Sequence, residues 1–270
     1  MLPGSALPAI QVILDIGDLP IGLRTADSGF AGMLQARYAG FVTPGVRPAA
    51  EFDIELVSPE TMSPDDDLRV TTVAGRWTFE RGDFRAEFDP AVRRGHIRQS
   101  ASPYAIDSVL RIVHTLLLAG TGGFLLHAAS GMRNGRALLF AGQSGAGKTT
   151  IASLAPNDVT LFSDEVSYVR RLPEGYRSYG TPFTGELAKP GANRSAPVGA
   201  LYLLVKGGAN RIEPVGPAEA VRRLLENILF FARESSPVVQ LLQTACEFVS
   251  QVSVYRLTFL PDARVWEMIV

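Results

Sequence analysis

A glycine-rich loop is the feature that most constrains what this chain can fold into. Residues 142–149 read GQSGAGKT and match every position of the pattern G-x-x-x-x-G-K-[ST]. The apolar run ALLFA precedes this loop and TTIASLA follows it, so the sequence places the loop between a strand and a helix. Glycines let the backbone fold tightly enough for successive N–H groups to point at a phosphate. We therefore expect the chain to bind a nucleoside triphosphate.

The loop residues have expected roles toward ATP and Mg²⁺, the two cofactors that the pattern predicts. Lys148 is expected to reach the β- and γ-phosphates, and the hydroxyl of Thr149 is expected to ligate Mg²⁺. The predicted nucleotide-binding residues are Gly142, Gln143, Ser144, Gly145, Ala146, Gly147, Lys148, Thr149 and Thr150.

Two adjacent acids follow the next apolar run. Asp164 and Glu165 come after VTLF, with Ser163 between, which places the carboxylates at or just past the end of a predicted strand. We expect that strand to lie beside the strand of the loop, where an acid can hold or orient the metal ion. An acid pair at a strand end can also be merely solvated, but the loop upstream favours a function.

One histidine stands just before the loop strand. His127 ends the apolar run FLL. From the residues alone, such a histidine is more often a packed core or turn residue than a catalytic one.

The predicted secondary structure changes from strands to a helix near residue 100. Between residues 10 and 99, short β-type runs alternate with turn signals about every ten residues, and the run at 34–42 is one of them. From Tyr104 to Leu118 the apolar residues recur at helical spacing. We predict a β-rich N-terminal domain over residues 1–102, for substrate recognition or assembly, and a catalytic domain over residues 103–270.

Charge and cysteine content exclude several classes of protein. Lys and Arg number 26 against 27 Asp and Glu, without the positive excess of a non-specific nucleic-acid binder. A single cysteine, Cys246, rules out an internal disulfide and predicts a reducing, cytoplasmic setting. The N-terminus lacks the pattern of a signal peptide, and glycines and a histidine interrupt the longest apolar stretch, 116–129. We expect neither a membrane nor a nucleic acid as partner.

The order of these elements resembles the C-terminal catalytic domain of the HPr kinase/phosphorylase family. That family has a histidine, a phosphate-binding loop about twenty residues later, and an apolar strand ending in two acids. Here the series is His127, the loop with Lys148, and the pair Asp164 and Glu165, and Glu186 is the counterpart of a later metal-binding glutamate. The resemblance covers roughly residues 120–270. It implies an α/β P-loop catalytic domain of the HPr kinase and PEP carboxykinase type, joined to the β-rich N-terminal domain.

The resemblance also implies a role for each residue. The catalytic residues would be His127, Lys148, Asp164 and Glu165, and the Mg²⁺ ligands Thr149, Asp164 and Glu186. Either Asp164 or Glu165 would be the base, because a one-residue shift exchanges them. The glycine-rich stretch of true HPr kinases is replaced by LAKPGANRSAP at 187–197. The chain therefore looks more like the relatives associated with lasso-peptide biosynthesis than like a true HPr kinase.

The resulting expectation is an ATP-dependent kinase that phosphorylates a serine hydroxyl of a peptide or protein, such as a ribosomally made precursor peptide. Homo-oligomerisation is implied by the family alone. Two alternatives stay open: a nucleotide-binding regulatory module with little catalysis, and a small-molecule kinase or carboxykinase-like enzyme.

Overall fold

The computed structural model describes residues 9–58, 67–231 and 235–269, and residues 1–8, on which the expectation about export partly depends, lie outside them. The chain divides into two compact units, Met1–Ile112 and Val113–Val270. Helix α2 (Pro103–Ala119) crosses this division, and the sequence-based boundary at 102/103 falls at its first residue. No helix in the described ranges is long and apolar enough to cross a membrane.

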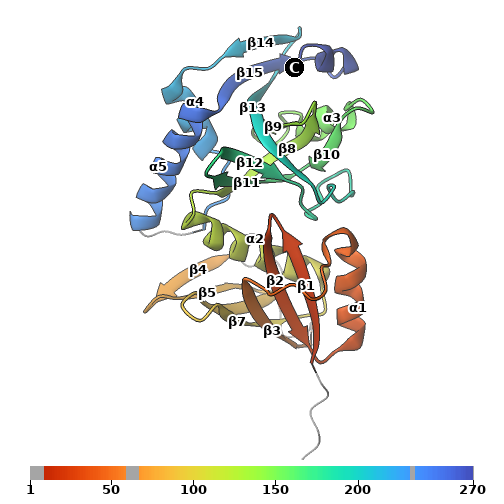
Figure 1. Ribbon diagram of the computed structural model, residues 1–270, viewed down its shortest axis with the longest axis vertical. Coiled ribbons are helices and arrows are strands. Elements are labelled where there is room, and N and C mark those ends of the chain that lie inside the picture. The colour runs from red at the N-terminus through yellow and green to blue at the C-terminus, as the bar shows by residue number, and fades with distance from the viewer. Residues whose placement is uncertain (1–8, 59–66, 232–234, 270) are drawn as a thin grey trace, which may run out of the picture. The chain divides into compact units, whose positions relative to one another are not determined.

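The first unit is built on a seven-stranded mixed sheet with the order β1-β2-β3-β7-β6-β5-β4 (Figure 1). Strands β2, β3 and β7 pair in parallel, and the other neighbours pair antiparallel. The strands are β1 (Ile10–Ile16), β2 (Leu19–Thr25), β3 (Ala50–Leu56), β4 (Arg69–Val73), β5 (Arg76–Arg81), β6 (Phe84–Asp89) and β7 (Arg94–Gln99).

A helix replaces one of the expected strands of this unit. Residues 34–42 were predicted to be β-type, but α1 (Ser28–Arg37) and a short 3₁₀ helix (Ala39–Phe41) cover most of them. The carboxylate of Asp27 accepts the N–H of Phe30 at 2.7 Å and caps the first turn of α1. The parallel pairing of β2 with β3 requires a crossover between these strands, and α1 supplies it.

The second unit holds an eight-stranded mixed sheet. Its path is β10-β8-β11-β12-β13-β15-β14, and β9 pairs with both β8 and β13. The strands are β8 (Phe124–Arg133), β9 (Arg136–Ala141), β10 (Thr160–Ser163), β11 (Val166–Leu172), β12 (Gly175–Tyr179), β13 (Ser195–Lys206), β14 (Arg211–Pro214) and β15 (Ser253–Phe259).

Helices cover both faces of this sheet. Strand β9 alternates its side chains, so that Leu139 joins a core with α4 (Pro217–Leu225) and α5 (Ser235–Gln251). Its neighbour Phe140 joins the opposite core with α3 (Lys148–Ser153) and the C-terminal 3₁₀ helix (Ala263–Glu267). Strands β9, β13 and β15 are parallel to one another, so their carboxyl ends meet at one edge of the sheet, where residues 142–147 emerge.

The predicted α/β P-loop fold is wrong. Both units are mixed β-sheet domains, and in the second unit only β9, β13 and β15 pair in parallel among the described strands. An α/β fold alternates strands with helices along the chain and pairs the strands in parallel. Here β8 instead pairs antiparallel with β9, β10 and β11. The loop motif is local and states only that a strand, a loop and a helix follow one another, whereas strand pairing is set by distant segments.

Candidate functional site

The glycine-rich loop connects the end of β9 directly to α3. The N–H of Ala146 donates to the carbonyl of Gln143 at 3.0 Å and closes a turn. Gly145 and Gly147 have φ values of 76° and 107°, in the left-handed region that glycine adopts without strain. A Cβ on Gly147 would also lie 2.7 Å from the ring of Phe259. The loop therefore needs these glycines for its shape and for its packing.

Lys148 lies across this loop and is only 8% exposed. Its Nζ donates to the carbonyl of Gly142 at 2.7 Å and to that of Gln143 at 3.3 Å. Burial lowers the pKa of Lys148, and the negative charges of Glu165 and Glu186 act in the opposite direction. The ammonium group is thus bonded to two loop carbonyls, and the negative charges of two glutamates stabilise its protonated form.

A pocket of about 580 Å³ brings most of the predicted site residues together. We call it the acidic pocket; its lining residues are His127, Ser144, Gly145, Gly147, Lys148, Thr149, Thr150, Asp164, Glu165, Thr184, Gly185 and Glu186. Gly142, Gln143 and Ala146 do not line it. Thr184 and Gly185 were not predicted, since nothing in the sequence marks them apart from their closeness to Glu186.

A break in a strand presents the two acids. Strand β10 ends with Ser163 opposite Ser130, and β11 begins with Val166 opposite His127, so both strands follow β8 as one interrupted line. The hydroxyl of Ser163 accepts the N–H groups of Glu165 at 3.1 Å and Val166 at 2.8 Å. These bonds hold the backbone at residues 164–165, where pairing with β8 is interrupted, while the register shift lies earlier, between Leu161 and Ser163.

The location of the acids differs from the expectation in one respect. They were predicted at a strand end beside the loop strand, but β8 lies between β10 and β9. The acids still reach the loop because the break occurs opposite the centre of β8, close to His127.

Asp164 and Glu165 have different surroundings. Asp164 is 5% exposed; its Oδ1 accepts the N–H of Gly185 and its Oδ2 that of Leu187, both at 2.9 Å. A Cβ on Gly185 would lie 2.9 Å from Oδ2 of Asp164. Asp164 therefore anchors the turn that carries Glu186, whereas Glu165 is the member of the pair whose charge acts on Lys148.

The backbone around His127 is held from both sides. Val166 of β11 pairs with His127 on one side. On the other, the N–H of His127 donates to the carbonyl of Asn227 at 2.7 Å, in the segment that follows α4. This arrangement fixes the point from which the imidazole enters the acidic pocket.

The acidic pocket fits a magnesium ion only together with a phosphate. In the described ranges, no group of three or more His, Cys, Asp or Glu side chains is placed to hold a metal ion. Mg²⁺, however, is usually bound by one or two carboxylates with substrate phosphates. Thr149 and Glu186 supply such hard oxygen donors beside Lys148, and both oxygens of Asp164 are already engaged by amides.

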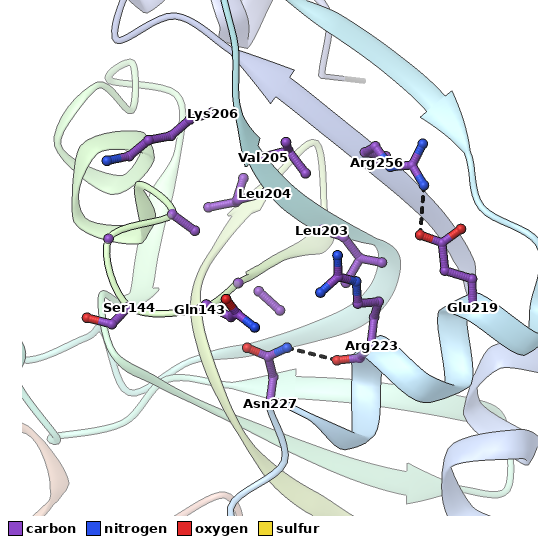
Figure 2. A pocket seen from close by; sticks show the side chains of 14 residues that line it. Gln143, Ser144, Leu203, Leu204, Val205, Lys206, Glu219, Arg223, Asn227 and Arg256 are labelled. Carbon is purple, nitrogen blue, oxygen red and sulfur yellow. Dashed lines mark hydrogen bonds and ion pairs between the residues drawn. The ribbon is translucent and has the colours of Figure 1, made fainter.

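A second pocket, of about 360 Å³, is also lined by this loop (Figure 2). We call it the arginine pocket; it is lined by residues 141–146 of β9 and the loop, residues 203–206 of β13, and Glu219, Arg223, Asn227 and Arg256. Ser144 and Gly145 line both pockets. Apart from the loop residues, no sequence pattern pointed to this pocket, because it is assembled from four segments that are distant in the sequence.

Comparison with protein-family models gives a match to the second part of the chain. Residues 99–270 match the family model described as SynChlorMet cassette protein ScmC, which is nearly two thirds of the chain. No curated protein matches the chain.

Proposed function

We propose that this chain, which belongs to the ScmC family of SynChlorMet cassette proteins, is a kinase that transfers the γ-phosphoryl group of ATP to a serine hydroxyl of a peptide or protein. The observation that carries this proposal is the position of Lys148, buried between loop carbonyls and the two glutamates Glu165 and Glu186. The succession of His127, loop, acid pair and glutamate, which resembles HPr kinases, supports it.

The loop and Lys148 bind the phosphates of the donor. Phosphoryl transfer depends mainly on positioning and on neutralising charge, and backbone amides with one buried ammonium group provide both. The lowered pKa of Lys148 reflects its desolvation, and an anionic phosphate beside it would stabilise the charged form. Thr149 and Glu186 would hold Mg²⁺, which neutralises charge on the β- and γ-phosphates when bound.

Glu165 is the base in this proposal. It accepts the proton of the serine hydroxyl, the serine oxygen bonds to the γ-phosphorus, and the bond to the ADP oxygen breaks. We assign this role to Glu165 and not to Asp164, because Asp164 is 5% exposed and its two oxygens hold the 185–187 turn, whereas the charge of Glu165 acts on Lys148. Asp164 instead positions Glu186.

His127 acts beside these groups. It lines the acidic pocket with Lys148 and Glu165, and its backbone is fixed by Asn227 and Val166. We assign it the orientation of the γ-phosphate or of Glu165. A reducing, cytoplasmic setting belongs to the same proposal, since the chain has one cysteine, Cys246.

Phosphorylation of peptides tests the proposal. The protein is incubated with Mg²⁺, γ-labelled ATP and a panel of serine peptides, and label on serine is measured by mass spectrometry. We expect label with the wild type and none with Lys148→Ala, while Lys189→Ala, an exposed lysine outside the acidic pocket, matches the wild type. Equal labelling by Lys148→Ala would refute the assignment. ATP binding without any labelled acceptor would favour the regulatory module.

A further inference from the structure

The arginine pocket shares the phosphate-binding loop with the acidic pocket. Gln143 faces only the arginine pocket, Lys148 faces only the acidic pocket, and Ser144 and Gly145 line both. A ligand whose phosphates are bound by this loop can therefore extend from one pocket into the other without leaving the protein surface.

The two pockets differ in charge. The acidic pocket contains Asp164, Glu165 and Glu186. The arginine pocket contains a single acid, Glu219, whose Oε1 accepts from Nη2 of Arg256 at 2.7 Å. The carboxylates suit a metal ion and an acceptor hydroxyl at the γ end of a triphosphate, so the rest of the donor is better placed in the arginine pocket.

The lining of the arginine pocket suits a ribose and a base. Its wall is apolar at the end of β13, where Leu203 and Leu204 lie, and polar at Gln143, Arg223 and Asn227. Figure 2 shows these three residues on the loop, on α4 and on the segment after α4, with the amide nitrogen of Asn227 bonded to the backbone carbonyl of Arg223. A guanidinium group can stack on an aromatic base, and amides can bond to its edge. The volume of about 360 Å³ falls in the usual range for small-molecule sites.

The location in the sheet agrees with this assignment. The pocket lies at the carboxyl ends of β9 and β13, which pair in parallel. In open α/β sheets, ligands commonly bind outside the carboxyl ends of parallel strands, and β9, β13 and β15 form such a parallel group within this mixed sheet. The segment after α4 also connects the two pockets, because Asn227, which is 7% exposed, lines the arginine pocket and its carbonyl holds the N–H of His127.

We propose that the arginine pocket binds the nucleoside half of the phosphoryl donor, with Arg223 stacking on the base. This inference rests on the proposed function, since it takes the loop as the site of the triphosphate. It assigns the donor to the arginine pocket and leaves the mouth of the acidic pocket to the acceptor.

Binding of ATP and of inorganic tripolyphosphate, each with Mg²⁺, separates the two halves of the site. Arg223→Ala should weaken ATP binding about tenfold, the scale of one lost cation–π contact, and leave tripolyphosphate binding unchanged. Arg222→Ala is the matched control, because Arg222 and Arg223 both pair with Glu226 but only Arg223 lines the pocket.

A pocket-filling variant gives a second readout. Val205 lines the arginine pocket and is 36% exposed, so Val205→Trp can fill the pocket without entering a core. It should also lower affinity for ATP and spare tripolyphosphate. Val239→Trp on α5, at an exposed valine outside the pocket, controls for the added tryptophan.

The outcomes distinguish this inference from the proposed function. Unchanged ATP affinity in both pocket variants, or a raised KM for the peptide acceptor instead, would overturn the inference and leave the kinase proposal standing. Selective loss of ATP binding in a protein that phosphorylates no peptide would support the inference and count against the kinase. A wild type that binds neither ATP nor tripolyphosphate would overturn both.

Discussion

The amide of Gly185 donates to Oδ1 of Asp164 at 2.9 Å across twenty-one residues of sequence. With the second bond from Leu187, this contact ties the turn that carries Glu186 to the break in the strand that carries Glu165. One buried carboxylate, that of Asp164, therefore holds the turn of Glu186 beside Glu165, and substitutions should separate a positioning role for Asp164 from a catalytic role for Glu165.

Glu165→Gln should abolish phosphoryl transfer and leave folding unchanged, because Glu165 is the proposed base and is partly exposed. Asp164→Asn should lower the free energy of unfolding by about 1–3 kcal/mol, since an amide offers one acceptor where the carboxylate serves two N–H groups. Thermal unfolding and single-turnover phosphorylation measure the two effects. A large loss of stability in Glu165→Gln with none in Asp164→Asn would reverse the assignment.

Gly185→Ala should reduce the phosphorylation rate without unfolding the protein. The added Cβ would lie 2.9 Å from Oδ2 of Asp164 and 3.0 Å from Cβ of Glu165, so both acids must shift. Gly208→Ala is a fitting control, because a Cβ there meets nothing within 4 Å. If both variants retain the wild-type rate, the turn does not control the geometry of the acids.

Ser163→Ala should also impair the site from outside the pocket lining. Its hydroxyl accepts the N–H groups of Glu165 and Val166, and their loss should cost about 1–3 kcal/mol of stability and displace Glu165. Ser250→Ala, which removes an exposed hydroxyl bonded to the carbonyl of Glu247, serves for comparison. Denaturant unfolding and the rate of transfer are the measurements, and parity between the two variants would contradict the prediction.

ATP affinity should fall as pH rises toward the lowered pKa of Lys148. Desolvation brings this pKa below the ordinary 10.5, so the native state loses its proton before the unfolded state does. Between the lowered pKa of native Lys148 and 10.5, the unfolded state binds more protons than the native state, so the free energy of unfolding rises with pH. Over the same pH range, native Lys148 loses the positive charge that is proposed to bind phosphate. Titration of ATP binding from neutral pH to pH 10.5 follows the loss.

The same titration in Glu165→Gln tests the electrostatic coupling. The charge of Glu165 raises the pKa of Lys148, so its removal should move the midpoint of ATP loss to lower pH. Lys148→Arg should remove the pH dependence in this range, because a guanidinium group stays charged. A midpoint that does not move in Glu165→Gln would show that the two groups do not interact.

The candidate site was largely predictable from the sequence because its central element is local. Gly145, Gly147 and Lys148 lie within four residues. The two glycines have positive φ values, which glycine adopts without strain, so the shape of the loop can be expected from its own residues. Asp164 and Glu165 were expected from their place after an apolar run, and His127 and Glu186 by resemblance, and the structure brings all four to the pocket of Lys148. Their chemical roles stay predictions.

The fold was less predictable, and the errors have physical causes. Residues 34–42 contain β-type side chains, but the cap at Asp27 and the crossover between β2 and β3 favour a helix over most of the segment. The α/β expectation failed because antiparallel pairing of β8 with three other strands depends on contacts between distant segments.

The sequence by itself determined the glycine-rich loop and its attachment to a strand and a helix, since these follow from glycines and a lysine in eight consecutive positions. Only the tertiary structure distinguished Asp164 from Glu165. Two adjacent acids look alike in a sequence. In the structure, Asp164 accepts the amides of Gly185 and Leu187, whereas the charge of Glu165 interacts with Lys148. Hydrogen bonds between distant residues make that difference, and the chain must fold before they exist.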